Sequence, residues 1–227
     1  METVFLIVEY IGMISFAISA TLIAVDKRAD FVGAALFALL TSFGGGIIRD
    51  VILGQTPRVF SLFEYRIMAF VCVFVSVVLF GLCFTESIRT KISSMRHGIV
   101  LELTDAIGLA VYSVFGAEVA IQMGVTVPTL TIFCGCITGV GGGVLRDICS
   151  AEIPFVFRKR VYLVPSILGA TLLTLTYEYI PPILSILISI ALIVTIRLLA
   201  YYFEWDFPTP LGREEKNEKK NEERINK

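Results

Sequence analysis

The chain has 227 residues, of which 56% are hydrophobic and 17% charged, and its mean hydropathy is +0.82. A soluble domain is usually about half apolar and about a quarter charged. Residues 211–227 alone hold eleven of the 39 Asp, Glu, Lys and Arg residues, which leaves 28 in the first 210 residues. So few charges cannot cover a water-soluble surface. The composition therefore excludes a soluble globular enzyme and indicates a polytopic membrane protein.

Seven apolar segments are expected to cross the membrane as helices, because about twenty residues at ~1.5 Å each span a ~30 Å hydrocarbon core. They lie at about residues 3–24, 31–53, 65–84, 99–121, 127–149, 162–179 and 182–203. Pro128 suits the first turn of the fifth helix, and Pro181-Pro182 separates the last two. We expect a single all-α transmembrane domain in residues 1–210 and a charged tail in residues 211–227.

Basic residues are unevenly distributed between the two sides of the membrane. The side that bears the tail carries, in its three other loops, Lys27, Arg28, Arg89, Lys91, Arg96, Arg158, Lys159 and Arg160. The opposite side holds at most Arg49, Arg58 and Arg66. The positive-inside rule then predicts a multi-pass protein of the cell (inner or plasma) membrane, with a cytoplasmic C-terminus and an external N-terminus.

One stretch of the sequence occurs twice, 97 positions apart. Residues 41–60 read TSFGGGIIRDVILGQTPRVF, and residues 138–157 read TGVGGGVLRDICSAEIPFVF. The match extends backwards with a one-residue gap, so that Glu9 corresponds to Asp105 and Phe16 to Tyr112. Three helices (about 3–84) are thus repeated in the next three (about 99–179), and the seventh (about 182–203) stands outside. Because three is odd, the copies enter the membrane from opposite faces, which predicts an inverted 3+3 repeat plus one helix.

Each copy carries a glycine triplet about fourteen residues into a helix. The triplets are Gly44, Gly45 and Gly46 in the second helix and Gly141, Gly142 and Gly143 in the fifth. An interior glycine costs up to ~1 kcal/mol relative to alanine, so we expect both helices to be broken there. A break would expose carbonyl oxygens to a passing cation, and Thr41, Ser42 and Thr138 would add hydroxyls. The alternative is that the glycines allow close helix packing.

Charged residues follow both triplets, as Arg49-Asp50 and Arg146-Asp147. Ionisable residues so near the membrane core usually face the protein interior or water. Neighbours on a helix do not face each other, so Arg49 need not pair with Asp50 and can find a partner on another helix or reach the interface. These four residues are candidates for conduction or gating, with structural ion pairs or interfacial anchors as the alternative.

Glu9 and Asp105 form a matched acidic pair in the early turns of the first and fourth helices, near opposite membrane faces. Acidic groups at both mouths of a pathway concentrate cations and repel anions. We expect no enzyme, cofactor or metal site, because His97 is the only histidine and the Cys134-Gly-Cys136 spacing is not that of a zinc site.

The duplicated GGGxxRD stretch and its following proline, on a frame of 3+3+1 helices, resemble the trimeric intracellular cation (TRIC) channels, and most closely their prokaryotic branch. The resemblance covers about residues 5–203. It implies a homotrimer in which each subunit has its own pore, lined by the kinked second and fifth helices and permeable to monovalent cations, above all K⁺. By matching position, both glycine triplets are the kink glycines and Arg49 and Arg146 the basic residues beyond them. Phe16 and Tyr112 join the pore-lining candidates. The partners expected are further copies of the chain and membrane lipids, without nucleic acid.

Two other functions remain open at this point. Related bacterial sequences have been described as probable glycine transporters, and inverted repeats with broken helices are equally typical of secondary transporters. In such a transporter Arg49 or Arg146 could hold a carboxylate. A non-transporting membrane scaffold is the third possibility, against which stand the matched charged residues.

Overall fold

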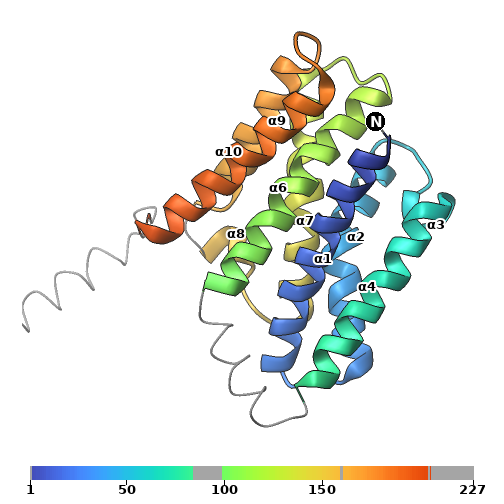
Figure 1. Ribbon diagram of the computed structural model, residues 1–227, viewed down its shortest axis with the longest axis vertical. Coiled ribbons are helices and arrows are strands. Elements are labelled where there is room, and N and C mark those ends of the chain that lie inside the picture. Colours follow the sequence, from blue (N-terminus) through green and yellow to red (C-terminus); the bar gives the residue numbers. More distant parts are fainter. Residues whose placement is uncertain (1, 84–98, 159–160, 204, 206–227) are drawn as a thin grey trace, which may run out of the picture.

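The computed structural model describes residues 2–83, 99–158, 161–203 and 205, and the chain there is almost entirely helical (Figure 1). The first half comprises α1 (Glu2–Asp26), α2 (Phe31–Ile52), the short α3 (Arg58–Ser61) and α4 (Phe63–Leu82). The second half comprises α6 (Ile99–Gln122), α7 (Pro128–Cys149), the short α8 (Phe155–Arg158) and α9 (Leu163–Thr176), and α10 (Pro182–Tyr202) follows. The predicted charged tail in residues 211–227 lies outside the described residues, as do Arg89, Lys91, Arg96, Lys159 and Arg160.

Six of the described helices are long and apolar enough to cross a membrane, namely α1, α2, α4, α6, α7 and α10. The predicted all-α membrane fold is thereby confirmed. A seventh full-length span is not, because α9 has 14 residues, which reach ~21 Å at ~1.5 Å per residue. The chain leaves the helix after Thr176 and turns before Pro181, where the Tyr179 N–H donates to the Thr176 carbonyl at 3.0 Å.

Corresponding helices of the two halves run in opposite directions and pack against each other. Figure 1 shows α1 antiparallel to α6 and α2 antiparallel to α7. Within each pair the two helices pack against each other. Matched residues meet where α1 and α6 cross: the rings of Phe16 and Tyr112 stack with centroids 5.4 Å apart and an interplanar angle of 5°. A Cβ at Gly12 would lie 2.6 Å from the Val111 side chain, so this crossing also requires glycine.

The glycine triplets lie where α2 and α7 cross. Both helices run through their triplets without interruption, so the expected break at Gly-Gly-Gly is not found. A Cβ at Gly45 would collide with the Thr138 carbonyl oxygen, and one at Gly142 with the Thr41 carbonyl oxygen. A Cβ at Gly141 would lie 3.2 Å from the Cα of Gly45. The triplets are needed because two backbones touch there, and this close contact compensates for the low helix propensity of glycine.

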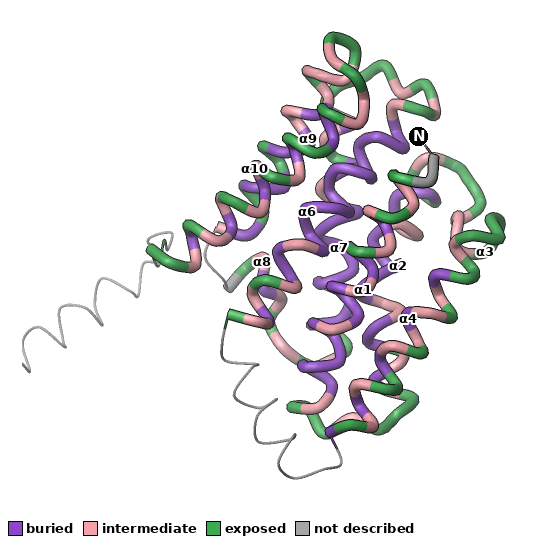
Figure 2. Tube along the Cα trace, in the orientation of Figure 1, coloured by how far each residue is buried: buried purple, intermediate pink, exposed green. Residues whose placement is uncertain are grey.

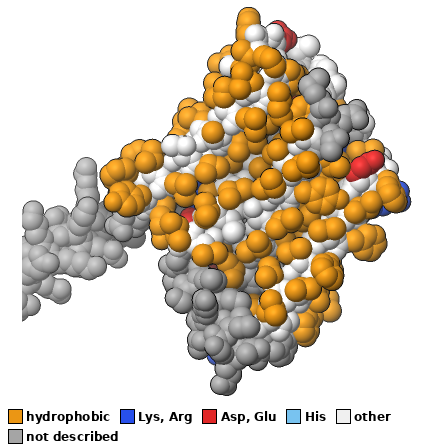
Figure 3. Space-filling view, viewed as in Figure 1, with side chains coloured by type: hydrophobic (Ala, Val, Ile, Leu, Met, Phe, Trp, Pro, Cys, Tyr) orange, Lys and Arg blue, Asp and Glu red, His pale blue; other side chains and the backbone are white. Residues whose placement is uncertain are grey.

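Burial separates an inner group of helices from an outer one. In Figure 2 the buried residues concentrate on α1, α2, α6 and α7, whereas α4, α9 and α10 have long exposed stretches. Most of the exposed side chains there are apolar, for example Phe70 and Phe74 on α4, and Figure 3 shows a surface dominated by hydrophobic side chains with few charges. Such a surface is suited to lipid or to another subunit rather than to water.

Candidate functional site

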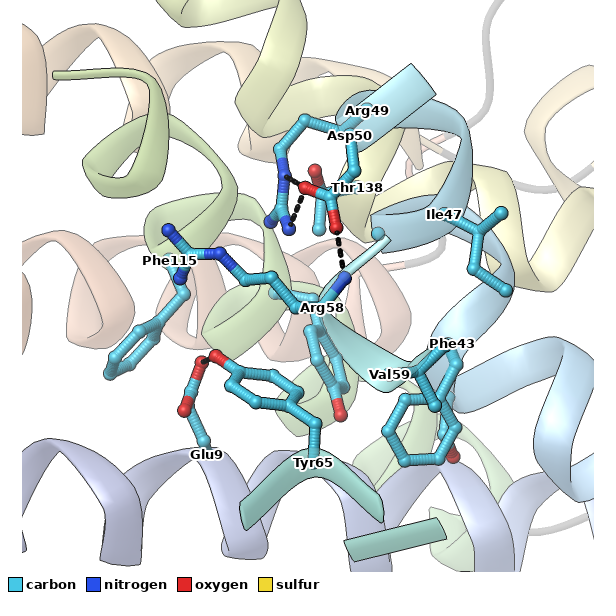
Figure 4. Close-up of a pocket in the computed structure, with 13 residues that line it drawn as sticks. Glu9, Phe43, Ile47, Arg49, Asp50, Arg58, Val59, Tyr65, Phe115 and Thr138 are labelled. Atoms are coloured by element: carbon cyan, nitrogen blue, oxygen red, sulfur yellow. Dashed lines mark hydrogen bonds and ion pairs between the residues drawn. The ribbon is translucent and has the colours of Figure 1, made fainter. Parts of the chain in front are cut away.

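A small cavity lies between the two repeats, beside the end of α2. We call it the Glu9 cavity (Figure 4); its volume is about 30 Å³, enough for about one water molecule. Its walls come from α1, α2, α3, α4, α6 and α7. The lining residues are Glu9, Ser42, Phe43, Gly46, Ile47, Arg49, Asp50, Arg58, Val59, Tyr65, Tyr112, Phe115 and Thr138.

Arg49 and Asp50 pair with each other although they are adjacent in the helix. Arg49 Nε and Nη2 both donate to Asp50 Oδ1, at 2.9 and 2.6 Å. Asp50 Oδ2 accepts the backbone N–H of Arg58 at 2.8 Å. The sequence left the partner of Arg49 open; the long arginine side chain turns back over its neighbour. Asp50 thereby joins the end of α2 to the start of α3.

The second repeat reproduces this arrangement. Arg146 Nε donates to Asp147 Oδ1 at 2.9 Å, and the backbone N–H of Phe155 donates to Asp147 Oδ2 at 2.9 Å. Arg146 also reaches other helices, since its Nη1 lies 3.1 Å from Ser19 Oγ and 3.4 Å from Asp105 Oδ1. Arg146 is fully buried, so these contacts replace its hydration.

Glu9 and Asp105, predicted at the two mouths, are both buried and both have partners. Glu9 accepts a hydrogen bond of 2.6 Å from the Tyr65 hydroxyl, and its partners and neighbours are drawn in Figure 4. Asp105 is 1% exposed and faces two arginines, Arg146 and Arg197. Their role in attracting cations stays a prediction. Tyr65 was missed at the sequence level, although it repeats as Tyr162 with the same spacing of 97.

Arg197 of α10 is the second residue that sequence reasoning missed. Its Nη2 lies 3.1 Å from Glu102 Oε2 and 3.4 Å from Asp105 Oδ2, and its guanidinium carbon lies 4.5 Å from the ring centroid of Tyr162. A lone arginine in an otherwise apolar helix was the available signal, because ionisable residues inside membrane helices are rarely without a role. We call Asp105, Arg146, Asp147, Tyr162 and Arg197 the Asp105 cluster.

The predicted hydroxyl ligands are divided between the cavity and the core. Thr138 and Ser42 line the Glu9 cavity, whereas Thr41 is 1% exposed and lies outside it. Each threonine donates to the carbonyl one turn earlier at 2.6 Å, Thr41 to Phe37 and Thr138 to Cys134. Among the two glycine triplets only Gly46 lines this cavity; Tyr112 lines it too, and Phe16 lies behind Tyr112.

In the part of the chain that the structure describes, no three His, Cys, Asp or Glu side chains are grouped so that they could hold a metal ion. His97 lies outside that part.

Comparison with known proteins places this geometry in a family. A family model described as "Glycine transporter" matches residues 6–83 and 102–178, which are the two repeats. A UPF0126 membrane protein of Vibrio cholerae is 32% identical over 207 residues, with 89% of this chain and 81% of the relative covered. The UPF0126 inner membrane protein YadS of Escherichia coli is 29% identical over 204 residues, with 89% and 93% covered.

Comparison with solved structures shows which channel family the chain belongs to. A structure reported as the basis for conductance through TRIC cation channels shares 30% identity and a TM-score of 0.74, covering 89% of this chain and 95% of that one. The TRIC orthologue from Rhodobacter sphaeroides shares 30% identity and a TM-score of 0.76, covering 89% and 99%. This chain belongs to the prokaryotic TRIC family. It is accordingly a multi-pass integral membrane protein.

Proposed function

We propose that this chain is a cation channel of the cell membrane that conducts monovalent cations, with K⁺ as the main permeant ion. The observation that carries the proposal is the Glu9 cavity, which lies inside a single subunit and is lined by a carboxylate, hydroxyls and the last glycine of a triplet. Oxygen atoms are the ligands that replace the hydration shell of an alkali cation. The relatives described as cation channels share this fold over most of their length.

The Glu9 cavity is lined by two carboxylates, of Glu9 and Asp50, and by two guanidinium groups, of Arg49 and Arg58. Arg49 is paired with Asp50, so these two charges largely cancel. Glu9 is hydrogen-bonded by the neutral hydroxyl of Tyr65 and forms no ion pair with any of the described residues. The backbone N–H of Arg58 is bonded to Asp50, whereas its guanidinium remains a positive charge in the wall and acts on Glu9. Glu9 is therefore the carboxylate of this wall that a cation can approach, because its direct hydrogen-bond partner is a neutral hydroxyl and the Arg58 charge acts on it only from a distance.

The assembly and the location belong to the same proposal. A homotrimer with one pore in each subunit fits a relative described as a trimeric intracellular cation channel and leaves the apolar faces of α4 and α10 for lipids or neighbouring subunits. Location in the inner membrane fits the description of the Escherichia coli relative. The C-terminus is proposed to be cytoplasmic, on the distribution of basic residues.

Recording from purified protein in planar bilayers with asymmetric KCl tests conduction and ion preference together. We expect unitary currents that reverse near the K⁺ equilibrium potential. The family description "Glycine transporter" is a name and reports no transport measurement. Saturable, gradient-dependent glycine uptake into liposomes without unitary currents would overturn the channel proposal in favour of a secondary transporter.

Neutralising Glu9 is expected to weaken conduction without disturbing the fold. In Glu9→Gln the side chain still accepts the Tyr65 hydrogen bond but no longer attracts cations, so unitary conductance in dilute KCl should fall by about half or more. The difference should shrink in ~1 M KCl, where the Debye length is ~3 Å. Glu64→Gln is the matched control, because Glu64 is an exposed carboxylate in the first turn of α4. Equal losses in both variants, or none in either, would contradict the role given to Glu9.

A further inference from the structure

An apolar groove lies along the seam between α2 and α4, with α3 at one end. We call it the α2–α4 groove; its volume is about 470 Å³, within the ~300–1,000 Å³ that ligand pockets usually have. The α2 wall includes a stripe that begins at Leu40 and ends at Ile47, and the α4 wall is a stripe of the same helical spacing, formed by Arg66, Ala69, Phe70 and Val73. Of the described residues that line the groove, Arg66 is the only one with a polar side chain. The groove is therefore suited to a hydrocarbon chain.

The α2–α4 groove and the Glu9 cavity share a wall. Phe43, Ile47 and Val59 line both spaces. Figure 4 shows these three side chains together on one side of the cavity, whereas Glu9 lies on the other side. A molecule in the groove would therefore contact the outer surface of residues that enclose the Glu9 cavity.

Arg66 places a positive charge at one end of the groove, in the first turn of α4. Its side chain is exposed, and its guanidinium carbon lies 5.7 Å from the ring centroid of Phe63, a contact that orients the side chain. Arg66 forms no ion pair with any residue in the described part of the chain. The neighbouring carboxylate, Glu64, is two positions away, and residues two apart do not face each other on a helix. Arg66 is therefore available to an anion from outside the subunit.

A phospholipid matches this arrangement along its whole length. Because α2 and α4 are both long and apolar enough to cross a membrane, the stripes of the groove lie at the depth of acyl chains, and Arg66, near a helix end, lies at the depth of headgroups. Arginine binds phosphate oxygens through paired N–H donors. A zwitterionic headgroup would bring a second cation beside Arg66, so a headgroup with a net negative charge fits better.

A second copy of the chain fits the groove less well than a lipid does. It would have to present a carboxylate to Arg66 while filling the groove with apolar side chains. Of the acidic side chains that the structure describes, only Glu64 and Glu178 are exposed at this end of the molecule. Both lie at the ends of helices, whereas a phospholipid carries its negative charge directly on an apolar chain.

We propose that the α2–α4 groove binds an acyl chain of an anionic phospholipid, and that Arg66 donates hydrogen bonds to the phosphate group of that lipid. The bound chain packs on Phe43, Ile47 and Val59, the wall that the groove shares with the Glu9 cavity. Binding of the lipid does not depend on ion conduction, so the inference goes beyond the proposed function.

Quenching of tryptophan fluorescence by brominated lipids tests the site in the full-length protein. Trp205→Phe removes the native tryptophan, and Phe70→Trp places a reporter in the wall of the groove. The vesicles are equimolar mixtures of phosphatidylglycerol and phosphatidylcholine in which one lipid or the other carries brominated chains. We expect brominated phosphatidylglycerol to quench this reporter preferentially, with an affinity about fivefold higher, the factor that one basic residue near a membrane surface contributes. The preference should disappear in the Arg66→Gln background and shrink in ~1 M KCl, where the Debye length is ~3 Å.

Two further variants distinguish binding in the groove from a general attraction of anionic lipids. Ile188→Trp is the matched reporter, because Ile188 is exposed on α10, which runs in the same direction as α4 and has no basic residue before Arg197. It should show no preference between the two lipids. Ala69→Leu fills the groove and leaves Arg66 in place, so it should reduce the preference at the Phe70→Trp reporter.

Three results would overturn the lipid site. The first is the same preference at both reporters, including none. The second is a preference at the Phe70→Trp reporter that survives Arg66→Gln or Ala69→Leu. The third is weak quenching of this reporter by both lipids beside strong quenching of the Ile188→Trp reporter, which would show that another subunit covers the groove.

Discussion

Alanine at Gly45 or at Gly142 is expected to destabilise the protein by about 1–3 kcal/mol or more, although alanine favours a helix over glycine at most positions. The added Cβ of Gly45→Ala would meet the carbonyl oxygen of Thr138, and that of Gly142→Ala the carbonyl oxygen of Thr41. Neither obstacle is the end of a flexible side chain. Relief therefore requires α2 and α7 to move apart along their whole contact.

The third glycine of each triplet provides the control within the same three residues. A Cβ at Gly46 has its nearest neighbour, Arg49 Nη2, at 3.7 Å, and one at Gly143 lies 3.4 Å from the Tyr162 hydroxyl. Gly46→Ala should therefore be neutral or gain up to ~1 kcal/mol. Thermal unfolding of the purified variants, with size-exclusion chromatography of the oligomer, separates the two classes.

The comparison also distinguishes packing from helix breaking. If the triplets acted by making the helix flexible, alanine at any of the three positions would stiffen it and the three variants would behave alike. Similar melting temperatures for Gly45→Ala and Gly46→Ala would contradict the crossing as the reason for the glycines. Loss of folding confined to Gly45 and Gly142 would support it.

The sequence predicts the relation between the two repeats well, because duplicated segments adopt the same local structure and their matched residues occupy equivalent positions. Matched residues occupy equivalent positions in the two halves. Two of them, Phe16 of α1 and Tyr112 of α6, stack on each other where these helices cross. The antiparallel course of α1 and α6 follows from the odd number of helices in each copy. The same reasoning places the glycine triplets in equivalent positions.

Whether those triplets break a helix could not be decided from the sequence. Both outcomes need glycine: a break needs its conformational freedom and a crossing needs its lack of a side chain. In a membrane, an interrupted helix leaves polar backbone groups that cost several kcal/mol each unless they are satisfied. Contact with another triplet avoids that cost, but the contact becomes visible only when α2 and α7 are placed together.

The Asp105 cluster was only half predictable for a related reason. Asp105, Arg146 and Asp147 were identified through their counterparts in the other repeat. Arg197 has no counterpart, so a comparison of the repeats cannot find it, and its distance of 92 positions from Asp105 carries no local signal. Its contact depends on how α10 packs against the completed repeat, which is a property of the tertiary structure.

Neutralising Asp50 is expected to be more destabilising than neutralising Asp147, although the two residues are matched. Asparagine can retain an oxygen for the backbone N–H that each aspartate binds, so the connection to α3 or α8 can persist in both variants. The arginines differ. Arg146 keeps its contact with Asp105 when Asp147 is neutralised, whereas Asp50 is the only acidic partner of Arg49 among the described residues.

A buried charge left without its partner costs about 3–5 kcal/mol, and replacing both members of a pair with uncharged residues costs far less. Asp50→Asn should therefore approach that loss, and Asp147→Asn should lose clearly less. Adding Arg49→Met to Asp50→Asn should restore most of the lost stability, since no unpaired guanidinium then remains. Melting temperatures of the two single variants and the double variant, measured in one detergent, form the required cycle. Equal losses for Asp50→Asn and Asp147→Asn, or a double variant no more stable than Asp50→Asn, would show that the ion pair is not what these aspartates supply. The capping of α3 and α8 would then be their main contribution.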